Sequence, residues 1–383
     1  MERIYLDNAA TTRVAPEVVD AMMPYFSERY GNPSSLHALG TEAKEALEDA
    51  RTRLARRLNA TARELIFASG GTEANNLAIK GAAYENRAKG KHIITSRIEH
   101  SSVLNPLSWL QKQGYEITQL PVDEYGLVSP EDLGGAIRKD TVLVTIGHAN
   151  NEIGTVQDIG ELGKIAREKG VLFHTDACQS FTKEAIDAKA LSVDMVTINA
   201  HKINGPKGIG ALYIRAGVRI APQEHGGPHE YNMRGGTENV PGAVGFAKAA
   251  EITGEAEVSQ MRRLRDMLIK GIGETVRNSR LNGHPGMRLC NNVNHVFAGI
   301  EGESLLLRLD ARGIMGSTGS ACSSQSLEPS HVLLAIGLHP EDAHGSLRLT
   351  VGRYNREEEA KAAVDAVRDE VEGLRRISPT WRE

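Results

Sequence analysis

Short apolar runs alternate with helical patterns between residues 65 and 198, and this alternation constrains the fold more than any other feature of the sequence. Nearly all-apolar runs of this length are typical of strands buried on both faces, as in parallel sheets covered by helices. The pattern therefore predicts an α/β fold whose mostly parallel sheet carries helices on both faces. The predicted strands are Leu65–Ala68, His92–Thr95, Thr141–Ile146, Val171–Thr175 and Asp194–Ile198, and the predicted helices include Glu42–Leu58, 69–88 and Ile159–Lys169.

The character of the sequence changes near residue 257. An apolar stripe from Val258 to Ile272 predicts a long helix that links two domains. The remainder, from about Leu281, is expected to form a smaller α+β unit whose last helix begins at Asn355, with Glu358 in capping-box spacing. The predicted division is a large domain over residues 15–257 and a small domain that combines residues 1–14 and 258–383.

Composition excludes several classes of protein. The chain has 383 residues, and its apolar runs are far shorter than the roughly 20 residues that span a bilayer. The N-terminus lacks the pattern of a secretory signal, and the 3 cysteines form no C-x-x-C pair, so a reducing cytoplasm and no membrane association are expected. The 45 Lys+Arg and 49 Asp+Glu are interspersed, which argues against a nucleic-acid binder.

In an open parallel sheet, ligands bind beyond the carboxyl ends of the strands, so the residues that follow each strand are the candidates for a site. Ser69, Gly70, Gly71 and Thr72 open a helix after the first predicted strand, which favours an anion such as phosphate, although a plain strand-to-helix turn has the same sequence. The polar run His148, Asn150, Asn151 and Glu152 follows the third strand and is either part of a site or a turn with Asx hydrogen bonds.

Three further residues complete the pattern. His100 precedes a helix, Asp176 follows the fourth strand, and Lys202 lies on a glycine-rich turn after the fifth strand. A buried carboxylate needs a positive partner or several hydrogen bonds. A phosphate, a protonated pyridine and an aldehyde that forms a Schiff base with lysine satisfy all these groups together. The sequence therefore predicts pyridoxal 5′-phosphate (PLP) as cofactor, with Lys202 on the aldehyde and Asp176 on the ring nitrogen.

The chain also resembles the cysteine desulfurases of the NifS/IscS type, which are fold-type I PLP enzymes of the class V aminotransferase group. The resemblance runs from about residue 4 to the end of the chain. It rests on the motifs YLDNAATT, YGNPSSLH, SGGTEANNLAIKG, HANNEIGTVQ, HTDACQS, AHKINGPKGIGALYI, RGGTENV, STGSACSS, LEPSHVL and GSLRLTVGR. It implies a seven-stranded-type sheet, a homodimer whose sites use both chains, L-cysteine as substrate, and an iron–sulfur scaffold protein as sulfur acceptor.

The resemblance also implies residue roles. Lys202 forms the Schiff base and later moves the Cα proton, and His100 stacks on the ring and relays protons. The remaining cofactor residues are Asp176 on the ring nitrogen, Gln179 on the ring oxygen, Gly71, Thr72, Asn199 and His201 around the phosphate, and Thr237 on the phosphate of the neighbouring subunit. Asn151 and Arg348 hold the substrate carboxylate, and Asn151 also lies beside the cofactor.

Cys322 is the second pole of the implied mechanism. It lies in STGSACSSQS, where small and hydroxyl residues predict an exposed, mobile loop, whereas a single cysteine is otherwise most simply a buried packing residue. The Cys322 thiolate takes sulfur from cysteine as a persulfide, which leaves alanine and supplies iron–sulfur cluster assembly. No resident metal is implied, although Cys322 can contact an iron–sulfur cluster during transfer.

Some positions depart from the family pattern or have no implied role. Asn199 stands where Ser or Thr is usual, which leaves cofactor affinity open. Cys178 is expected to pack near the ring and Cys290 to be structural. His225 and His229 are expected in a loop near the site, because the intervening glycines and proline disfavour a helix, and His331 is expected to order the Cys322 loop.

Other functions stay open at this point. An aminotransferase or a selenocysteine lyase would share the fold, and an aminotransferase would not need Cys322. A non-catalytic platform that only docks a scaffold protein would have no use for Lys202. PLP absorbance and alanine production separate these alternatives.

Overall fold

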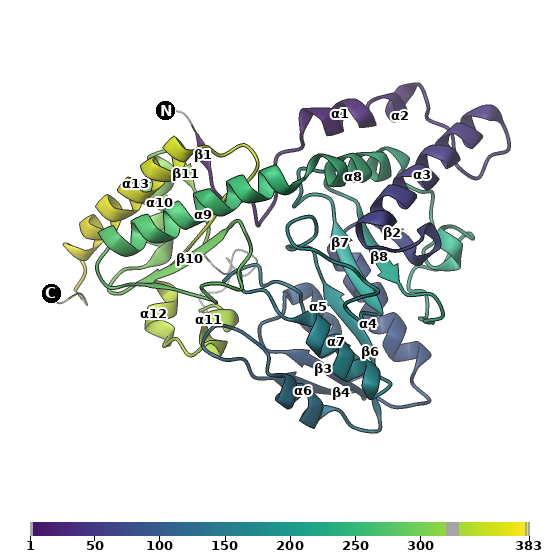
Figure 1. The fold of residues 1–383 in the computed structure, drawn as a ribbon, viewed down its shortest axis with the longest axis horizontal. Coiled ribbons are helices and arrows are strands. Elements are labelled where there is room, and N and C mark those ends of the chain that lie inside the picture. Colours follow the sequence, from purple (N-terminus) through teal and green to yellow (C-terminus); the bar gives the residue numbers. More distant parts are fainter. Residues whose placement is uncertain (1–2, 319–328, 380, 382–383) are drawn as a thin grey trace.

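A computed structural model of the chain describes residues 3–318, 329–379 and 381, and it has two bodies (Figure 1). The larger body contains a seven-stranded sheet between two layers of helices. The smaller body contains both ends of the described chain, and α9 (Glu255–Thr275) runs across it beside α13 (Glu357–Arg375) with one end directed toward the larger body. The division into a large domain over residues 15–257 and a small domain over residues 1–14 and 258–383 stays a proposal.

The elements of the larger body come mostly from the first two thirds of the chain. Its helices are α1 (Pro16–Met22), α2 (Pro24–Ser27), α3 (Ala38–Arg57), α4 (Gly71–Glu85), α5 (Ser101–Lys112), α6 (Pro130–Ala136), α7 (Ile159–Glu168) and α8 (Val240–Ile252), with short 3₁₀ turns η1 (Ala62–Glu64) and η2 (Glu230–Asn232). Its strands are β2 (Leu65–Ala68), β3 (His92–Ser96), β4 (Glu116–Leu120), β5 (Thr141–Thr145), β6 (Leu172–Asp176), β7 (Met195–Asn199) and β8 (Gly210–Ile214).

The smaller body is an α+β unit built on a three-stranded antiparallel sheet in the order β12-β10-β9. Its strands are β9 (Ser279–Leu281), β10 (Asn292–Phe297) and β12 (Ser346–Thr350), and its helices are α9, α10 (Gly302–Ala311), α11 (His331–Ala335), α12 (Pro340–His344) and α13 (Glu357–Arg375). The N-terminal strand β1 (Ile4–Tyr5) pairs with β11 (Ile314–Met315), so the start of the chain belongs to this body.

The large sheet has the order β2-β8-β7-β6-β5-β3-β4, and only β8 runs antiparallel to its neighbours. Successive residues of a strand point to opposite faces, and β2 illustrates this: Leu65 and Phe67 join the core beneath α3, α7 and α8, whereas Ile66 and Ala68 join the core beneath α4 and α5. The predicted fold class, a mostly parallel sheet covered on both faces, is confirmed.

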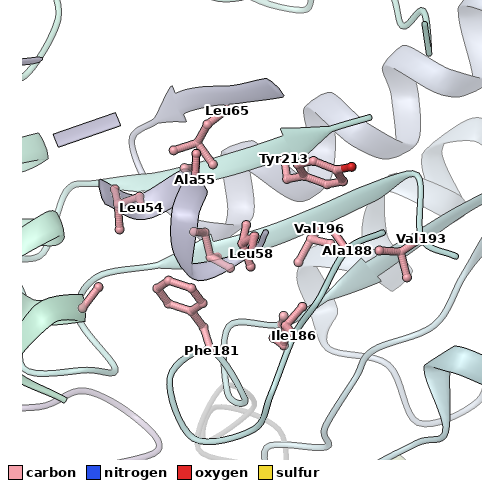
Figure 2. Close-up of a cluster of buried hydrophobic side chains, with 14 of the residues drawn as sticks. Leu54, Ala55, Leu58, Leu65, Phe181, Ile186, Ala188, Val193, Val196 and Tyr213 are labelled. Carbon is pink, nitrogen blue, oxygen red and sulfur yellow. The ribbon is translucent and has the colours of Figure 1, made fainter. Parts of the chain in front are cut away.

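Helix α3 packs over the β2–β8–β7 edge of the sheet (Figure 2). Leu54 of the helix and Leu58, which directly follows it, belong to the same buried cluster as Tyr213 of β8. Phe181 and Ile186 complete the cluster from the segment that follows β6. This packing fixes the segment after β6, which carries several residues of the site described below.

The structure corrects some predicted boundaries. The last helix begins at Glu357 and not at Asn355: the Arg356 N–H donates to the Glu359 carboxylate at 2.9 Å, whereas the Asn355 side chain accepts from the Gly352 N–H at 2.7 Å and is engaged in the preceding loop. Strands β4 and β8 were not predicted, because β4 is a half-exposed edge strand with polar residues and β8 begins inside a glycine-rich run.

None of the helices in the described ranges is sufficiently long and apolar to cross a membrane. Nor does the described part of the chain bring three or more His, Cys, Asp or Glu side chains together as metal ligands.

A buried ion pair joins α3 to η2 within the larger body. The Arg51 guanidinium donates to both carboxylate oxygens of Glu230, at 2.6 and 2.8 Å, and to the Leu65 carbonyl at 2.8 Å. Both charged side chains are 2% exposed, and Glu230 also accepts from the Phe67 N–H at 2.8 Å. Removing one charge from such a pair leaves the other buried and uncompensated.

We therefore expect Glu230→Gln to lower the free energy of unfolding by about 3 kcal/mol, measured by urea denaturation. Glu251→Gln is the matched control. Glu251, on α8, is an exposed carboxylate that pairs with Arg53, which lies on α3 as Arg51 does. The control should cost less than about 1 kcal/mol. Equal, small losses in both variants would contradict the role assigned to the buried pair.

Candidate active site

A cavity of about 490 Å³ lies where the carboxyl ends of β3, β5, β6 and β7 meet. It gathers most of the predicted site residues: Gly71, Thr72, His100, Asn151, Asp176, Gln179, Asn199, His201, Lys202 and Arg348 all line it. Thr237 is exposed and is not part of the lining. Cys322 lies outside the described residues.

The N-terminus of α4 forms one end of the cavity. A Cβ at Gly71 would lie 2.6 Å from the Cys178 sulfur and 3.4 Å from the Asn199 side-chain nitrogen, so only glycine fits there and the helix N-terminus stays open. The Asn199 Oδ1 atom is buried and has no hydrogen-bond partner among the residues described. Free backbone N–H groups at such a helix end favour an anion.

Asp176, the last residue of β6, is held as a carboxylate. Burial alone would raise its pKa, but hydrogen bonds from the Asn75 amide (2.6 Å) and the Cys178 N–H (2.9 Å) lower the pKa of Asp176 below its ordinary value, helped by nearby His100. An ionised carboxylate in a buried cavity is suited to a cationic partner.

Asn75 also connects Asp176 to His100. Its amide nitrogen donates to the Ser102 hydroxyl at 2.8 Å, and that hydroxyl lies 2.8 Å from Nδ1 of His100. The Ser102 N–H donates to the same Nδ1 at 3.1 Å, so in the neutral ring the proton is on Nε2. Burial, and then the positive charge of Lys202, lower the pKa of His100 and favour this neutral form.

Lys202 lies on the turn that follows β7, and the N-terminal segment of the chain fixes this turn. Thr12 donates to the His201 carbonyl from both its N–H (2.9 Å) and its hydroxyl (2.8 Å), and the hydroxyl accepts from the Asn204 N–H at 2.8 Å. Burial, with Lys202 nearby, lowers the pKa of His201 to about 4, so that ring is neutral.

Arg348 comes from β12 of the smaller body and enters the cavity beside the large sheet. Its guanidinium donates to Asp7 at 2.8 Å and to the Asn151 carbonyl at 3.0 Å. The side chain is 2% exposed, and its Nε has no hydrogen-bond partner within the described ranges. A buried N–H without a partner is costly, so this atom points to a ligand with an acceptor oxygen.

Two buried carboxyl groups in the lining received no role from the sequence. Burial raises the pKa of both Glu99 and Glu152 to about 7. Glu99 accepts from the Ser96 hydroxyl (2.6 Å) and the Gly147 N–H (2.9 Å), and Glu152 accepts from the Ser330 hydroxyl at 2.5 Å. Each of these two carboxyl groups is therefore partly protonated near neutral pH.

The histidine at the start of α11 is also part of the site. The Nε2 atom of His331 lies 3.0 Å from the Glu99 carbonyl, so this residue ties the smaller body to the turn that carries His100. His331 was expected to order the Cys322 loop, and that expectation stays a prediction, because residues 319–328 lie outside the described part.

The other singled-out residues have plainer positions. Cys178 is buried in the lining, as expected for a packing residue near the ring, and burial raises the pKa of its thiol. Cys290 is 1% exposed in the core of the smaller body, which confirms the structural interpretation. His225 and His229 lie in loop structure, as predicted, but neither lines the cavity.

The residues missed by the sequence analysis had weak signals. Asn75 lies inside the quoted motif SGGTEANNLAIKG but within a helix, and Glu99 directly precedes His100 in the segment after β3, where a single carboxyl group is not distinctive. Asp7 lies in the motif YLDNAATT, and only the fold brings it to Arg348. Glu152 was part of the polar run after β5, but its burial was not foreseeable from the sequence.

The cavity fits PLP by the chemistry of its groups. It offers a helix N-terminus for a phosphate at one end, a carboxylate for a pyridine nitrogen, and an amine on a glycine-rich turn for an aldehyde. The cradle at Gly71 would be filled by any larger residue. These residues suit a phosphorylated heteroaromatic aldehyde.

Comparison with known proteins points the same way. The profile of the family described as Aminotransferase class-V matches residues 4–363. A protein of Methanosarcina thermophila named "Cysteine desulfurase IscS" is 54% identical over 379 residues, covering 98% of this chain and 94% of that protein.

Solved structures agree with the sequence comparison. A structure titled "NIFS-LIKE PROTEIN" has a TM-score of 0.91 and 36% identity, covering 97% of this chain and 100% of that one. A structure titled "SspA in complex with cysteine" has a TM-score of 0.83 and 38% identity, covering 92% of this chain and 100% of that one.

The raised pKa of Glu152 makes folding stability depend on pH. A carboxyl whose pKa is higher in the folded chain contributes stability at low pH, and this contribution is lost as pH rises from about 4.5 through about 7. We expect Glu152→Gln to remove the part of the dependence that Glu152 causes and to be more stable than the parent protein above neutral pH, by up to roughly 3 kcal/mol.

Urea unfolding at pH 5 and pH 8 measures this difference. Glu99 titrates in both proteins, so the comparison isolates Glu152. Glu161→Gln, an exposed change on α7, is the control and should follow the parent at both pH values. A Glu152→Gln protein that loses stability at pH 8 would contradict the assignment.

Proposed function

Because the chain belongs to the class-V aminotransferase family and is a PLP-dependent cysteine desulfurase, we propose that the cavity at the carboxyl edge of the sheet is its active site. There it would convert L-cysteine to L-alanine and pass the sulfur to Cys322. The single observation that carries the proposal is that Lys202, the ionised Asp176 and the buried Arg348 line one cavity. The cysteine complex of the SspA structure supports it.

The cofactor-holding residues follow from the lining. Gly71, Thr72, Asn199 and His201 would hold the phosphate, and Asp176 would hold the ring nitrogen in its protonated form, with Gln179 on the ring oxygen. When bound, PLP supplies an electron sink for the electron pair released at the substrate Cα. Lys202 Nζ is the group proposed to hold the aldehyde.

Arg348 and Asn151 are the proposed binding residues for the substrate carboxylate. Asp7 and the Asn151 carbonyl fix the guanidinium, and its unpartnered Nε gives a further donor for a carboxylate oxygen. A planar guanidinium matches the two oxygens of a carboxylate. The substrate Cα is thereby oriented between the two bodies of the protein.

Two residues are proposed to move protons. Lys202 Nζ, as a free amine, would take the proton from the substrate Cα. His100, neutral and with its proton on Nε2, covers the ring and exchanges a proton with the substrate thiol. The network through Ser102 and Asn75 keeps the His100 ring in this tautomer.

Cys322 is the proposed sulfur acceptor. Its thiolate attacks the substrate sulfur, so that an S–S bond forms while the bond between Cβ and sulfur breaks. The electron pair of the broken bond stays with Cβ, which takes up a proton, and the proton held by Lys202 returns to Cα, so that alanine results. The products are alanine and a persulfide on Cys322, which is then passed to an acceptor protein; an iron–sulfur scaffold is the acceptor we propose.

A homodimer completes the proposal. Between the end of α1 and the start of α3 lie the exposed apolar residues Met23, Phe26, Tyr30 and Leu36, and a second copy of the chain would cover them. Thr237 is exposed and lies outside the cavity of its own chain, as a residue reaching the partner's phosphate would. A cytoplasmic location, where the thiol of Cys322 stays reduced, is part of the same proposal.

The test of the function uses the purified chain with PLP, cysteine and a thiol reductant, and measures alanine together with released sulfide. We expect equal amounts of both products. Cys322→Ala should keep the visible absorbance of bound PLP but lose alanine formation by on the order of a thousandfold or more, because the nucleophile is gone. Lys202→Ala should lose covalent PLP attachment as well.

Cys290→Ala is the control, since this cysteine is buried away from the cavity, and it should retain activity. If Cys322→Ala kept full activity, an aminotransferase would be the better interpretation. A protein that stays colourless with PLP would favour a docking platform.

The dimer is tested by the double variant Phe26→Glu/Leu36→Glu. Two charges on this apolar surface should shift the protein to a monomer in analytical ultracentrifugation and weaken PLP binding, because Thr237 of the partner is lost. Leu307→Glu, at an exposed position of α10, is the matched control and should stay dimeric. An unchanged dimer in the double variant would place the interface elsewhere.

A further inference from the structure

A second lysine, Lys183, is buried behind the cofactor cavity, and no step proposed above uses it. It follows β6 in the segment that Phe181 and Ile186 anchor in the core, and it is 8% exposed. Its ammonium donates to the Gln179 carbonyl at 2.8 Å and lies 3.4 Å from the Lys202 carbonyl. Both acceptors are the backbones of proposed cofactor residues.

An ammonium at this position costs folding free energy. No carboxylate forms an ion pair with Lys183 in the described part of the chain. The ionisable groups that act on it are Cys290, Lys202, Cys178 and Glu184, and Glu257 and Arg353 line the same small cavity as Lys183. Burial lowers the pKa of Lys183 to about 8. A charge buried with only neutral partners is unfavourable, and an apolar side chain of the same length would be cheaper.

The residue before it is strained. Thr182 has a φ of 67°, a left-handed conformation that β-branched residues rarely adopt. Its buried hydroxyl also has no hydrogen-bond partner within the residues that the structure describes. Strain of this kind persists where the surrounding structure imposes it, and it gathers at functional sites.

The position of Lys183 suits it to support the cofactor site, which can offset the free energy that burying its charge costs. Gln179 lies on the turn after β6 and Lys202 on the turn after β7, so one ammonium connects the two turns that carry the ring-oxygen and aldehyde partners. The cavity must take a phosphate, yet Arg348 is paired with Asp7, and the His100 and His201 rings are neutral. A positive charge behind Lys202 therefore has an anion to stabilise.

We propose that Lys183 is a positioning residue of the cofactor site, which holds the Gln179 and Lys202 turns together and supplies a buried positive charge for the anionic cofactor at the expense of folding stability. The inference rests on the proposed PLP site. It predicts that loss of the Lys183 charge weakens PLP binding but does not lower the folding stability. A purely structural lysine would not show this combination.

The test compares the full-length protein, stripped of PLP, with its Lys183→Met variant. The dissociation constant for PLP, from absorbance titration, should rise on the order of tenfold. The urea midpoint of the PLP-free variant should equal or exceed that of the parent, because an apolar chain replaces a buried charge. A lower midpoint, or a dissociation constant within about twofold of the parent, would overturn the proposal.

Lys183→Gln separates charge from hydrogen bonding, because the amide can still donate to a carbonyl but carries no charge. It should also bind PLP more weakly than the parent; binding as tight as the parent's would refute the electrostatic part. Lys189→Met, an exposed lysine on the same segment, is the matched control and should match the parent in both measurements.

The design distinguishes this inference from the proposed function. If the parent protein binds no PLP, the proposed site itself is wrong. If the parent binds PLP and Lys183→Met binds equally well, only the role of Lys183 is wrong.

Discussion

The carboxylate of Asp176 is the charge on which the rest of the site depends. It lies at the end of a buried strand, where a carboxyl would by itself take up a proton, and two donated hydrogen bonds keep it ionised. One donor is a backbone N–H of the following turn, and the other is the Asn75 amide on α4, so the first βα unit and the sixth strand must be in place together. Ser102 extends the same network to His100.

Much of this arrangement follows from the sequence because parallel strands bring their carboxyl ends to one edge. Gly71, His100, Asp176 and Lys202 each lie at or just beyond a predicted strand end, and the sheet gathers them in one cavity. Apolar runs predicted the buried strands. The exposed edge strand β4 has no such run, and β8 begins within a glycine-rich segment, so neither was predicted. The Asn355 side chain is engaged in a loop, so the local capping pattern failed there.

The unpredicted part of the site consists of contacts that are distant along the chain. Asp7 reaches Arg348 across 341 positions, and Ser330 reaches Glu152 across 178. Neither pairing has a local signal. Asp7 meets Arg348 within the smaller body, where the N-terminal segment lies beside β12, and Ser330 meets Glu152 where the smaller body packs on the larger one. The same holds for buried ionisable groups such as Glu99, Glu152 and Lys183, whose burial is a property of the fold and not of their sequence neighbours.

Reduction of the PLP-loaded protein with borohydride, followed by peptide mapping, tests the central claim most directly, because it converts a Schiff base into a stable bond on the lysine that formed it. We expect a single pyridoxyl label, on Lys202. A label on Lys183, Lys207 or any other lysine, or no label in a protein that has bound PLP, would contradict the assignment of the site.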